Sequence, residues 1–238
     1  VILEVGTGRV LAAASYPEFD PAAQAAVRER ERLNNKAFMY LFEPGSVMKP
    51  FTVAALLESG RLRPEEVIPA PMSLRVGNKT FRDVTRHDEN LSTWDVLRYS
   101  SNSGMINLGA RLSDGEHKAW LEAFGFNRDL KLPGAYTRSG VVREVPWYPQ
   151  DKAAITIGQS LSSTTLELAA AYSIFANDGL YLPPYVLEGQ DAAPSRRVLS
   201  PEVAHTMRAL LRYTAENSSI GDYPVPGFSL AGKTGTAD

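Results

Sequence analysis

The chain has 238 residues, 44% of them hydrophobic, which is enough to bury a core as one large domain or two small ones. Its 25 basic and 27 acidic residues are spread along the whole length and give a net charge of −2, so the sequence holds no basic stripe that would attract nucleic acid. The lack of cysteine excludes disulfides, thiolate metal sites and a thiol nucleophile.

No apolar run approaches the roughly 20 residues of a membrane helix, and the first residues lack the charged-then-apolar pattern of a signal peptide. Two short apolar runs, 1–5 and 10–15, flank a glycine turn at 6–9 and predict a β-hairpin. The first run already reads as the middle of a strand, and Ala237-Asp238 follows directly on a glycine-rich motif. Both ends therefore look cut from a longer chain.

The middle of the chain, from about residue 45 to residue 126, has the patterns of helices. Apolar residues recur at helical spacing over 45–60, and Gly60 is expected to stop this helix. Residues 93–126 have helical spacing interrupted by serine and glycine, which predicts several short helices packed together. We expect these to form a helical subdomain over about residues 80–160.

The last third predicts two more helices and a strand. Thr164 and Glu167 have the spacing of a capping box and predict a helix that should stop at Gly179. Ser200-Pro201-Glu202 offers an N-cap, a proline at the first position and an early acid, and so begins a second helix. The alternating segment 228–236 predicts a strand. The sheet-forming parts are therefore expected at about 1–25 and 180–238.

The first motif with chemistry is Ser46-Val47-Met48-Lys49. Pro50 is unfavourable deep in a helix, so it must lie near a helix start. Ser46 is then close to the helix N-terminus, where free backbone N–H groups favour a developing negative charge. Lys49 is three residues further on the same face, and it accepts a proton only if burial and neighbouring cations lower its pKa from about 10.4.

Two further motifs carry polar chemistry. Ser100-Ser101-Asn102 interrupts a packed helical pattern, although a simple turn between helices would look the same. In Lys233-Thr234-Gly235-Thr236, the glycine allows close approach of a ligand, and the lysine with two hydroxyls could hold a carboxylate. Each motif alone has an ordinary structural explanation, whereas the three in this order are the signature set of penicillin-binding proteins and serine β-lactamases.

With these motifs in hand, the chain resembles the class B penicillin-binding proteins from residue 1 to residue 238. Glu43-Pro44-Gly45-Ser46, Arg82-Asp83-Val84 and Ser100-Ser101-Asn102 resemble the division-specific branch. The resemblance implies an α/β (α+β) transpeptidase fold of the penicillin-binding protein and serine β-lactamase type. This fold has a central antiparallel sheet flanked by helices and a helical subdomain that carries the second motif.

The resemblance also implies roles. Ser46 would attack the carbonyl between two terminal D-alanines, Lys49 would be the general base, and Ser100 would relay a proton to the leaving amine. Asn102 would orient Lys49 and the substrate amide. The terminal carboxylate would be bound by the third motif, with an oxyanion hole formed by N–H groups of Ser46 and Thr236. The residues that the resemblance assigns to the site are Ser46, Lys49, Ser100, Asn102 and Lys233 as catalytic, and Thr234, Gly235 and Thr236 as substrate-binding.

No metal or cofactor is expected. The implied partners are stem peptides ending in D-Ala-D-Ala, β-lactam antibiotics, and divisome proteins that include a membrane glycosyltransferase. The implied location is the extracytoplasmic face of the bacterial cytoplasmic membrane, with an anchor that this sequence does not contain. The three histidines lie apart among charged or surface residues and are interpreted as structural or solvated: His87, His117 and His205.

Two alternatives stay open. A β-lactamase uses the same nucleophile but needs a base for its deacylating water, and the sequence identifies none. A non-catalytic β-lactam sensor or scaffold could also keep the motifs. The family further implies strands and a final helix after Lys-Thr-Gly, lying between the first hairpin and the last motif. We expect that these are supplied elsewhere or that the isolated 238 residues are inactive.

Overall fold

The computed structural model describes residues 1–17, 20, 22, 34–187 and 194–236. The described strands are β1 (Ile2–Leu3), β2 (Val10–Ala12), β3 (Val67–Pro69), β4 (Ser73–Val76), β5 (Lys79–Arg82), β6 (Asn90–Ser92), β7 (Leu180–Tyr181) and β8 (Arg196–Arg197). The described helices are α1 (Lys36–Met39), the 3₁₀ helix η3 (Gly45–Met48), α2 (Lys49–Glu58), α3 (Thr93–Arg98), α4 (Asn102–Gly109), α5 (Asp114–Phe124), α6 (Pro149–Thr156), α7 (Thr165–Ala176) and α8 (Pro201–Glu216).

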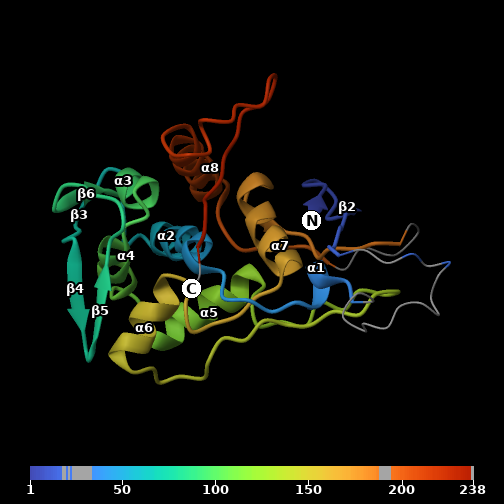
Figure 1. The fold of residues 1–238 in the computed structure, drawn as a ribbon, viewed down its shortest axis with the longest axis horizontal. Helices are drawn as coiled ribbons and strands as arrows, with labels where there is room; N and C mark the ends of the chain where they lie inside the picture. Colours follow the sequence, from blue (N-terminus) through green and yellow to red (C-terminus); the bar gives the residue numbers. More distant parts are fainter. Residues whose placement is uncertain (18–19, 21, 23–33, 188–193, 237–238) are drawn as a thin grey trace.

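Helix α2 lies in the middle of the molecule, in contact with α4, α5 and α8 (Figure 1). All residues from 49 to 56 are buried, as expected for a helix that is covered on every side. The Phe51 ring packs against four other aromatic rings, with centroids 5.0–5.3 Å apart: Phe124, Phe126, Tyr172 and Phe175. Aromatic contacts of this kind add to the stability gained by burial. Helix α2 is therefore held rigidly, and side chains at its start have defined positions.

The predicted helices are confirmed, and so are their end signals. Helix α7 begins with the full capping box of Thr164 and Glu167, and α8 has Ser200 as its N-cap with a proline in the first turn. Gly60 follows α2 with φ +67°, the left-handed conformation that ends many helices. The polar interruptions within 93–126 separate α3, α4 and α5. The limits of a helical subdomain at 80–160 stay a prediction.

The described strands form four two-stranded antiparallel sheets. The predicted first hairpin is confirmed, since β1 pairs with β2 and places Ile2 opposite Ala12. The β3–β6 and β4–β5 pairs lie on the far side of α4 from that hairpin (Figure 1) and were not predicted. An isolated bridge pairs Arg9, just before β2, with Tyr185, in the segment that follows β7. Parts of the expected sheet-forming ranges, namely 18–19, 21, 23–25, 188–193 and 237–238, lie outside the described residues.

The prediction of a strand at 228–236 is wrong. This segment returns past α8 toward the start of α2 and contains no strand (Figure 1). Alternating side chains make a strand only where a neighbouring backbone completes the hydrogen-bond ladder. Here the Gly232 N–H donates to the carbonyl of Leu211, which belongs to a helix. In the described part of the chain, no helix is both long and apolar enough to cross a bilayer.

Candidate active site

Ser46 lies in the 3₁₀ turn that leads directly into α2, as its spacing from Pro50 predicts. The turn is held from behind by Gly158, whose carbonyl accepts a 2.8 Å hydrogen bond from the Gly45 N–H. A Cβ at Gly158, where φ is +82°, would lie 1.9 Å from the Gly45 carbonyl oxygen. Only glycine allows this approach, so the backbone next to the Ser46 hydroxyl has a defined position.

Lys49 is fully buried, and its ammonium nitrogen is surrounded by oxygen atoms of the second motif. Nζ lies 2.6 Å from the Ser100 carbonyl, 3.2 Å from the Ser100 hydroxyl and 2.7 Å from the Asn102 side-chain oxygen. Burial lowers the pKa of Lys49 well below its usual value, the charge of Lys233 lowers it further, and Asp83 opposes the shift.

These contacts suit a lysine that works in its neutral form. A neutral amine has two hydrogens, and two of the surrounding oxygens, those of the Ser100 carbonyl and the Asn102 amide, are acceptors only. The lone pair is then free to accept a proton from a hydroxyl group. The lowered pKa increases the share of this form at any given pH, which is what a general base requires.

The second motif forms the tight connection between α3 and α4. Ser100 has φ +56°, a left-handed conformation that is costly for a residue with a side chain. Ser100 and Asn102 both face Lys49, while the fully buried Ser101 caps α4 through a bond from the Gly104 N–H. The spacing Ser-x-Asn therefore has a structural reason: the middle serine anchors the turn, and its neighbours present oxygen atoms to the lysine.

The third motif lies against the Ser46 turn. A Cβ at Gly235 would be 2.8 Å from the Pro44 carbonyl oxygen and from Val47 Cγ1, so glycine permits this packing. Lys233 is half-buried, and burial lowers its pKa to about 8. Its Nζ donates to the Thr234 carbonyl over 3.0 Å. The segment thus brings a second amine close enough to influence Lys49.

Five of the eight predicted site residues line one cavity of about 300 Å³: Ser46, Ser100, Asn102, Thr234 and Thr236. Lys49 lies beneath this cavity through its contacts with Ser100 and Asn102. Gly235 packs between the cavity wall and the Ser46 turn, and Lys233 acts on Lys49 through its charge. The structure therefore brings the three distant motifs together, while their individual catalytic roles stay predictions.

Sequence reasoning missed other residues of this region. The cavity is also lined by Val84, Thr85, Tyr99, Ile157 and Gln159. Asp83, quoted above only as part of a family resemblance, is a buried carboxylate directly behind Ser100–Asn102. Its position after a hairpin was the signal that could have found it, but the hairpin itself was not predicted.

The histidines have different environments. His117 is buried and bonded to the Thr52 hydroxyl over 3.1 Å, and burial lowers its pKa to about 4. His205 is exposed on α8, whereas the His87 side chain is buried against Asp83. Among the described residues, no group of three His, Asp or Glu side chains lies close enough together to hold a metal ion.

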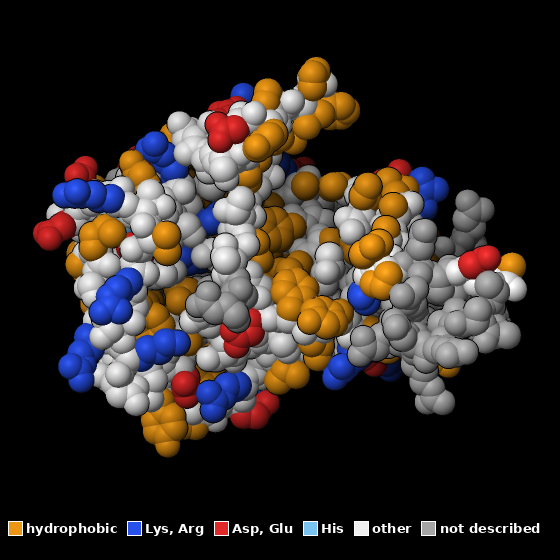
Figure 2. Space-filling view, viewed as in Figure 1, with side chains coloured by type: hydrophobic (Ala, Val, Ile, Leu, Met, Phe, Trp, Pro, Cys, Tyr) orange, Lys and Arg blue, Asp and Glu red, His pale blue; other side chains and the backbone are white. Residues whose placement is uncertain are grey.

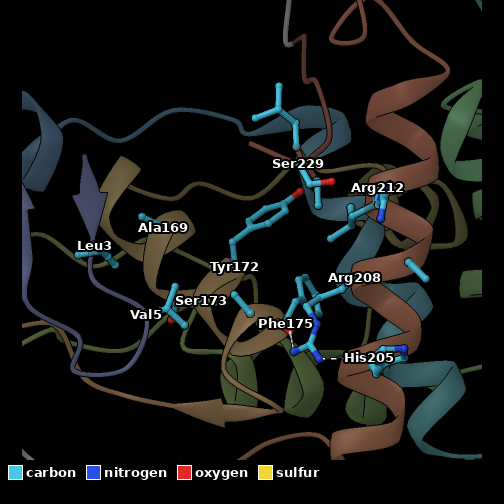
Figure 3. Close-up of a pocket in the computed structure, with 15 residues that line it drawn as sticks. Leu3, Val5, Ala169, Tyr172, Ser173, Phe175, His205, Arg208, Arg212 and Ser229 are labelled. Carbon is cyan, nitrogen blue, oxygen red and sulfur yellow. Dashed lines mark hydrogen bonds between the residues drawn. The ribbon is translucent and has the colours of Figure 1, made fainter. Parts of the chain in front are cut away.

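A larger cavity of about 610 Å³ lies between β1, α7, α8 and segment 229–231 (Figure 3). Apolar side chains gather in the hollow beside the descending terminal segment (Figure 2). None of the described residues that line this cavity belongs to the three motifs. The two regions touch at Tyr172, which lines the large cavity and donates a 2.8 Å hydrogen bond to the Val47 carbonyl beside Ser46. The size of a cavity alone therefore does not locate the chemistry.

Comparison with known proteins agrees with this geometry. Residues 1–238 match the penicillin binding protein transpeptidase domain, and the chain belongs to this family. The resemblance to class B penicillin-binding proteins is thereby confirmed at the level of the family and the fold.

The similar proteins are penicillin-binding proteins or peptidoglycan transpeptidases by name. The chain is 33% identical to "Penicillin-binding protein PbpB" of Mycolicibacterium smegmatis and 28% identical to "Peptidoglycan D,D-transpeptidase FtsI" of Escherichia coli K12. Each match covers 100% of this chain and 40% of the relative, so the chain spans about two fifths of the length of these relatives. The transpeptidase domain of Burkholderia pseudomallei penicillin-binding protein 3 superposes with a TM-score of 0.84 at 27% identity, covering 98% of this chain and 67% of that structure.

Proposed function

We propose that this domain is the catalytic part of a peptidoglycan D,D-transpeptidase that works through an acyl-serine intermediate and is acylated by β-lactams. The observation that carries the proposal is the buried amine of Lys49. It lies under the Ser46 cavity, its pKa is lowered, and its nitrogen faces both functional groups of the Ser-x-Asn motif.

In the first half-reaction, the Ser46 hydroxyl attacks the carbonyl of the penultimate D-alanine, and Lys49 accepts its proton. Backbone N–H groups of Ser46 and Thr236 stabilise the oxyanion. The bond to the terminal D-alanine then breaks, and its nitrogen receives a proton through Ser100, whose Oγ lies 3.2 Å from Lys49 Nζ. The products are a serine ester and free D-alanine.

In the second half-reaction, an amine of a neighbouring stem peptide attacks the ester, a peptide bond forms, and Ser46 regains its proton. The terminal carboxylate of the donor, or that of a β-lactam, binds at the third motif, where Lys233 contributes positive charge and Thr234 and Thr236 contribute hydroxyls on the cavity wall. Asn102 orients Lys49 and the substrate amide.

A β-lactamase is the main competing function. Deacylation needs a base that activates water, and among the described residues that line the Ser46 cavity there is no aspartate or glutamate. This favours acyl transfer to an amine over hydrolysis. A scaffold that does not react with β-lactams would need no lowered lysine pKa, so the environment of Lys49 also favours a reactive Ser46.

We extend the proposal to septal wall synthesis at the outer face of the bacterial cytoplasmic membrane, with divisome partners that include a membrane glycosyltransferase. This extension rests on the resemblance at Glu43–Ser46, Arg82–Val84 and Ser100–Asn102. Depletion of the protein in its host separates the two branches of the class. Filamentous cells support a role in division, and spherical cells contradict it in favour of elongation.

The activity is tested with a fluorescent penicillin. The protein should form a covalent adduct at Ser46 that persists for many minutes, and Ser46→Ala should form none. Intact-protein mass spectrometry and peptide mapping locate the adduct. An adduct lost within seconds would identify a β-lactamase, and a folded protein that never labels would identify a binding module.

A further inference from the structure

Asp83 occupies an unusual place for a carboxylate that the reaction does not use directly. It follows β5, is only 8% exposed, and its N–H donates to the Met72 carbonyl over 3.1 Å. A buried carboxylate is costly unless donors surround it. The donors that surround Asp83 therefore indicate which part of the chain this carboxylate holds in place.

The two carboxylate oxygens are bound by the beginning of α4. Oδ1 accepts from the backbone N–H groups of Asn102 (2.5 Å) and Ser103 (3.2 Å), and Oδ2 accepts from the hydroxyls of Ser101 (2.6 Å) and Ser103 (3.0 Å). The first N–H groups of a helix have no partner within the helix and carry its positive dipole end. Asp83 thus ties down the turn that contains Ser100–Asn102.

His87 supports the carboxylate from another side. Its ring Nε2 lies 2.9 Å from Asp83 Oδ2, and the side chains of both residues are at most 1% exposed. The other ring nitrogen, Nδ1, lies 2.7 Å from the Asp88 carbonyl oxygen. The ring is therefore held between two oxygen atoms and limits movement of Asp83 away from α4.

Arg82, which precedes Asp83, fixes the side-chain amide of Asn102. The Arg82 carbonyl accepts from the side-chain NH₂ of Asn102 over 2.8 Å, while Asp83 accepts from its backbone N–H. With both nitrogens bound, the side-chain oxygen of Asn102 is directed at Lys49. The same anchoring keeps Ser100 in its left-handed conformation with the hydroxyl at 3.2 Å from Lys49.

Asp83 also acts through its charge. Burial raises the pKa of Asp83, but the hydrogen bonds that it accepts outweigh burial and lower the pKa below its usual value, so the group is ionised at neutral pH. Its negative charge raises the pKa of Lys49, against the larger lowering by burial and the lowering by Lys233. The charged groups that influence Lys49 are thus Asp83 on one side and Lys233 on the other.

We propose that Asp83 is a positioning residue for acyl transfer, which holds Ser100 and Asn102 against Lys49 and sets the electrostatic environment of this lysine. The inference rests on the proposed function, since it assigns a supporting residue to the same site. It predicts an effect on the pH profile of acylation that a purely structural carboxylate would not have.

The experiment measures the rate constant of acylation by fluorescent penicillin from pH 5 to pH 10 in wild type and Asp83→Asn. Acylation needs neutral Lys49, so the rate rises as pH passes through the pKa of this lysine. Removing the negative charge lowers that pKa, and the acid limb should move to lower pH by roughly half a unit. The plateau rate should fall about tenfold or more, because the turn is less well held.

Asp95→Asn is the matched control, since Asp95 is another carboxylate that accepts bonds from two hydroxyls, those of Ser92 and Tyr213. It should change thermal stability without changing the acid limb or the plateau. Ser101→Ala and Ser103→Ala keep the charge of Asp83 and remove one donor each. They should lower the plateau several-fold and leave the acid limb in place, and they test the inference if Asp83→Asn fails to fold.

An unshifted acid limb in folded Asp83→Asn would overturn the inference while wild-type labelling at Ser46 upholds the proposed function. If Asp83→Asn does not fold, wild-type plateau rates in both serine variants would overturn it. Absence of labelling in the wild type would instead overturn the proposed function and the role of Asp83 with it.

Discussion

The two walls of the Ser46 cavity are built in different ways. The wall from α3 and α4 is joined to β5 and the following loop by a network of side-chain hydrogen bonds on Asp83 and Asn102. Among the described residues 229–236, the backbone hydrogen bond to the rest of the chain runs from Gly232 to Leu211, and Gly235 packs closely against the Ser46 turn. One wall is positioned by directional bonds, and the other by close packing.

This contrast explains why the motifs have different compositions. Oxygen atoms that must face Lys49 at 2.6–3.2 Å need a turn with every polar group satisfied, and that requires serine, asparagine and a buried carboxylate. For the carboxylate binding that we propose, the segment 233–236 needs exposed hydroxyls and a glycine that lets it lie close to Ser46. Substitutions in the wall from α3 and α4 should therefore lower activity by disturbing hydrogen bonds and charges. Substitutions in segment 229–236 should lower it by steric clashes.

The largest effect is expected at Gly158, which packs against the backbone of the Ser46 turn. Gly158→Ala places a Cβ 1.9 Å from the Gly45 carbonyl, so the Ser46 turn must move by about 1 Å or more. Such displacement costs about a hundredfold in rate, and we expect that loss in penicillin acylation. Gly227→Ala is the control, because its φ is also +82° and nothing lies within 4 Å of the new Cβ. Equal acylation by the two variants would show that the turn tolerates displacement.

A smaller effect is expected on the packed wall. Gly235→Ala brings a Cβ to 2.8 Å from the Pro44 carbonyl oxygen and from Val47 Cγ1, so the segment or the Ser46 turn must shift. We expect acylation at low antibiotic concentration to fall about tenfold, with little change in melting temperature. Gly232→Ala, whose nearest new neighbour is 3.9 Å away, should stay within about twofold of wild type. A loss of the same size in both variants would mean that steric fit at 235 is not what positions this wall.

The smallest effect concerns the charge of the packed wall. The pKa of Lys233 is about 8, so its positive charge is complete below this pH and is lost as pH rises through it. Binding of a carboxylate should weaken accordingly, and the second-order acylation rate should fall several-fold between about pH 7 and pH 9. Lys233→Arg keeps its charge over this range and should flatten the alkaline decline. An identical decline in the arginine variant would assign it to another group.

Much of the fold could be predicted because its signals are local. The capping box at Thr164, the N-cap at Ser200 and the glycine after α2 each act within one helical turn, so the sequence is enough to find them. The wrong strand at 228–236 shows the limit of this reasoning. Alternation is a local pattern, but a strand exists only if a partner backbone lies alongside, and no local signal reports that.

The candidate site likewise has features that local sequence signals predict and features that depend on long-range contacts. The sequence alone is enough to predict which side chains carry chemistry, because a nucleophile, a base and carboxylate-binding groups are recognised by residue type and by short spacings such as Ser46 to Lys49. Tertiary structure alone decides that Lys49 meets Ser100 and Asn102 from 51 and 53 residues away, and that Asp83 stands behind them. The pKa of Lys49 depends on burial and on distant charges, which exist only after the chain has folded.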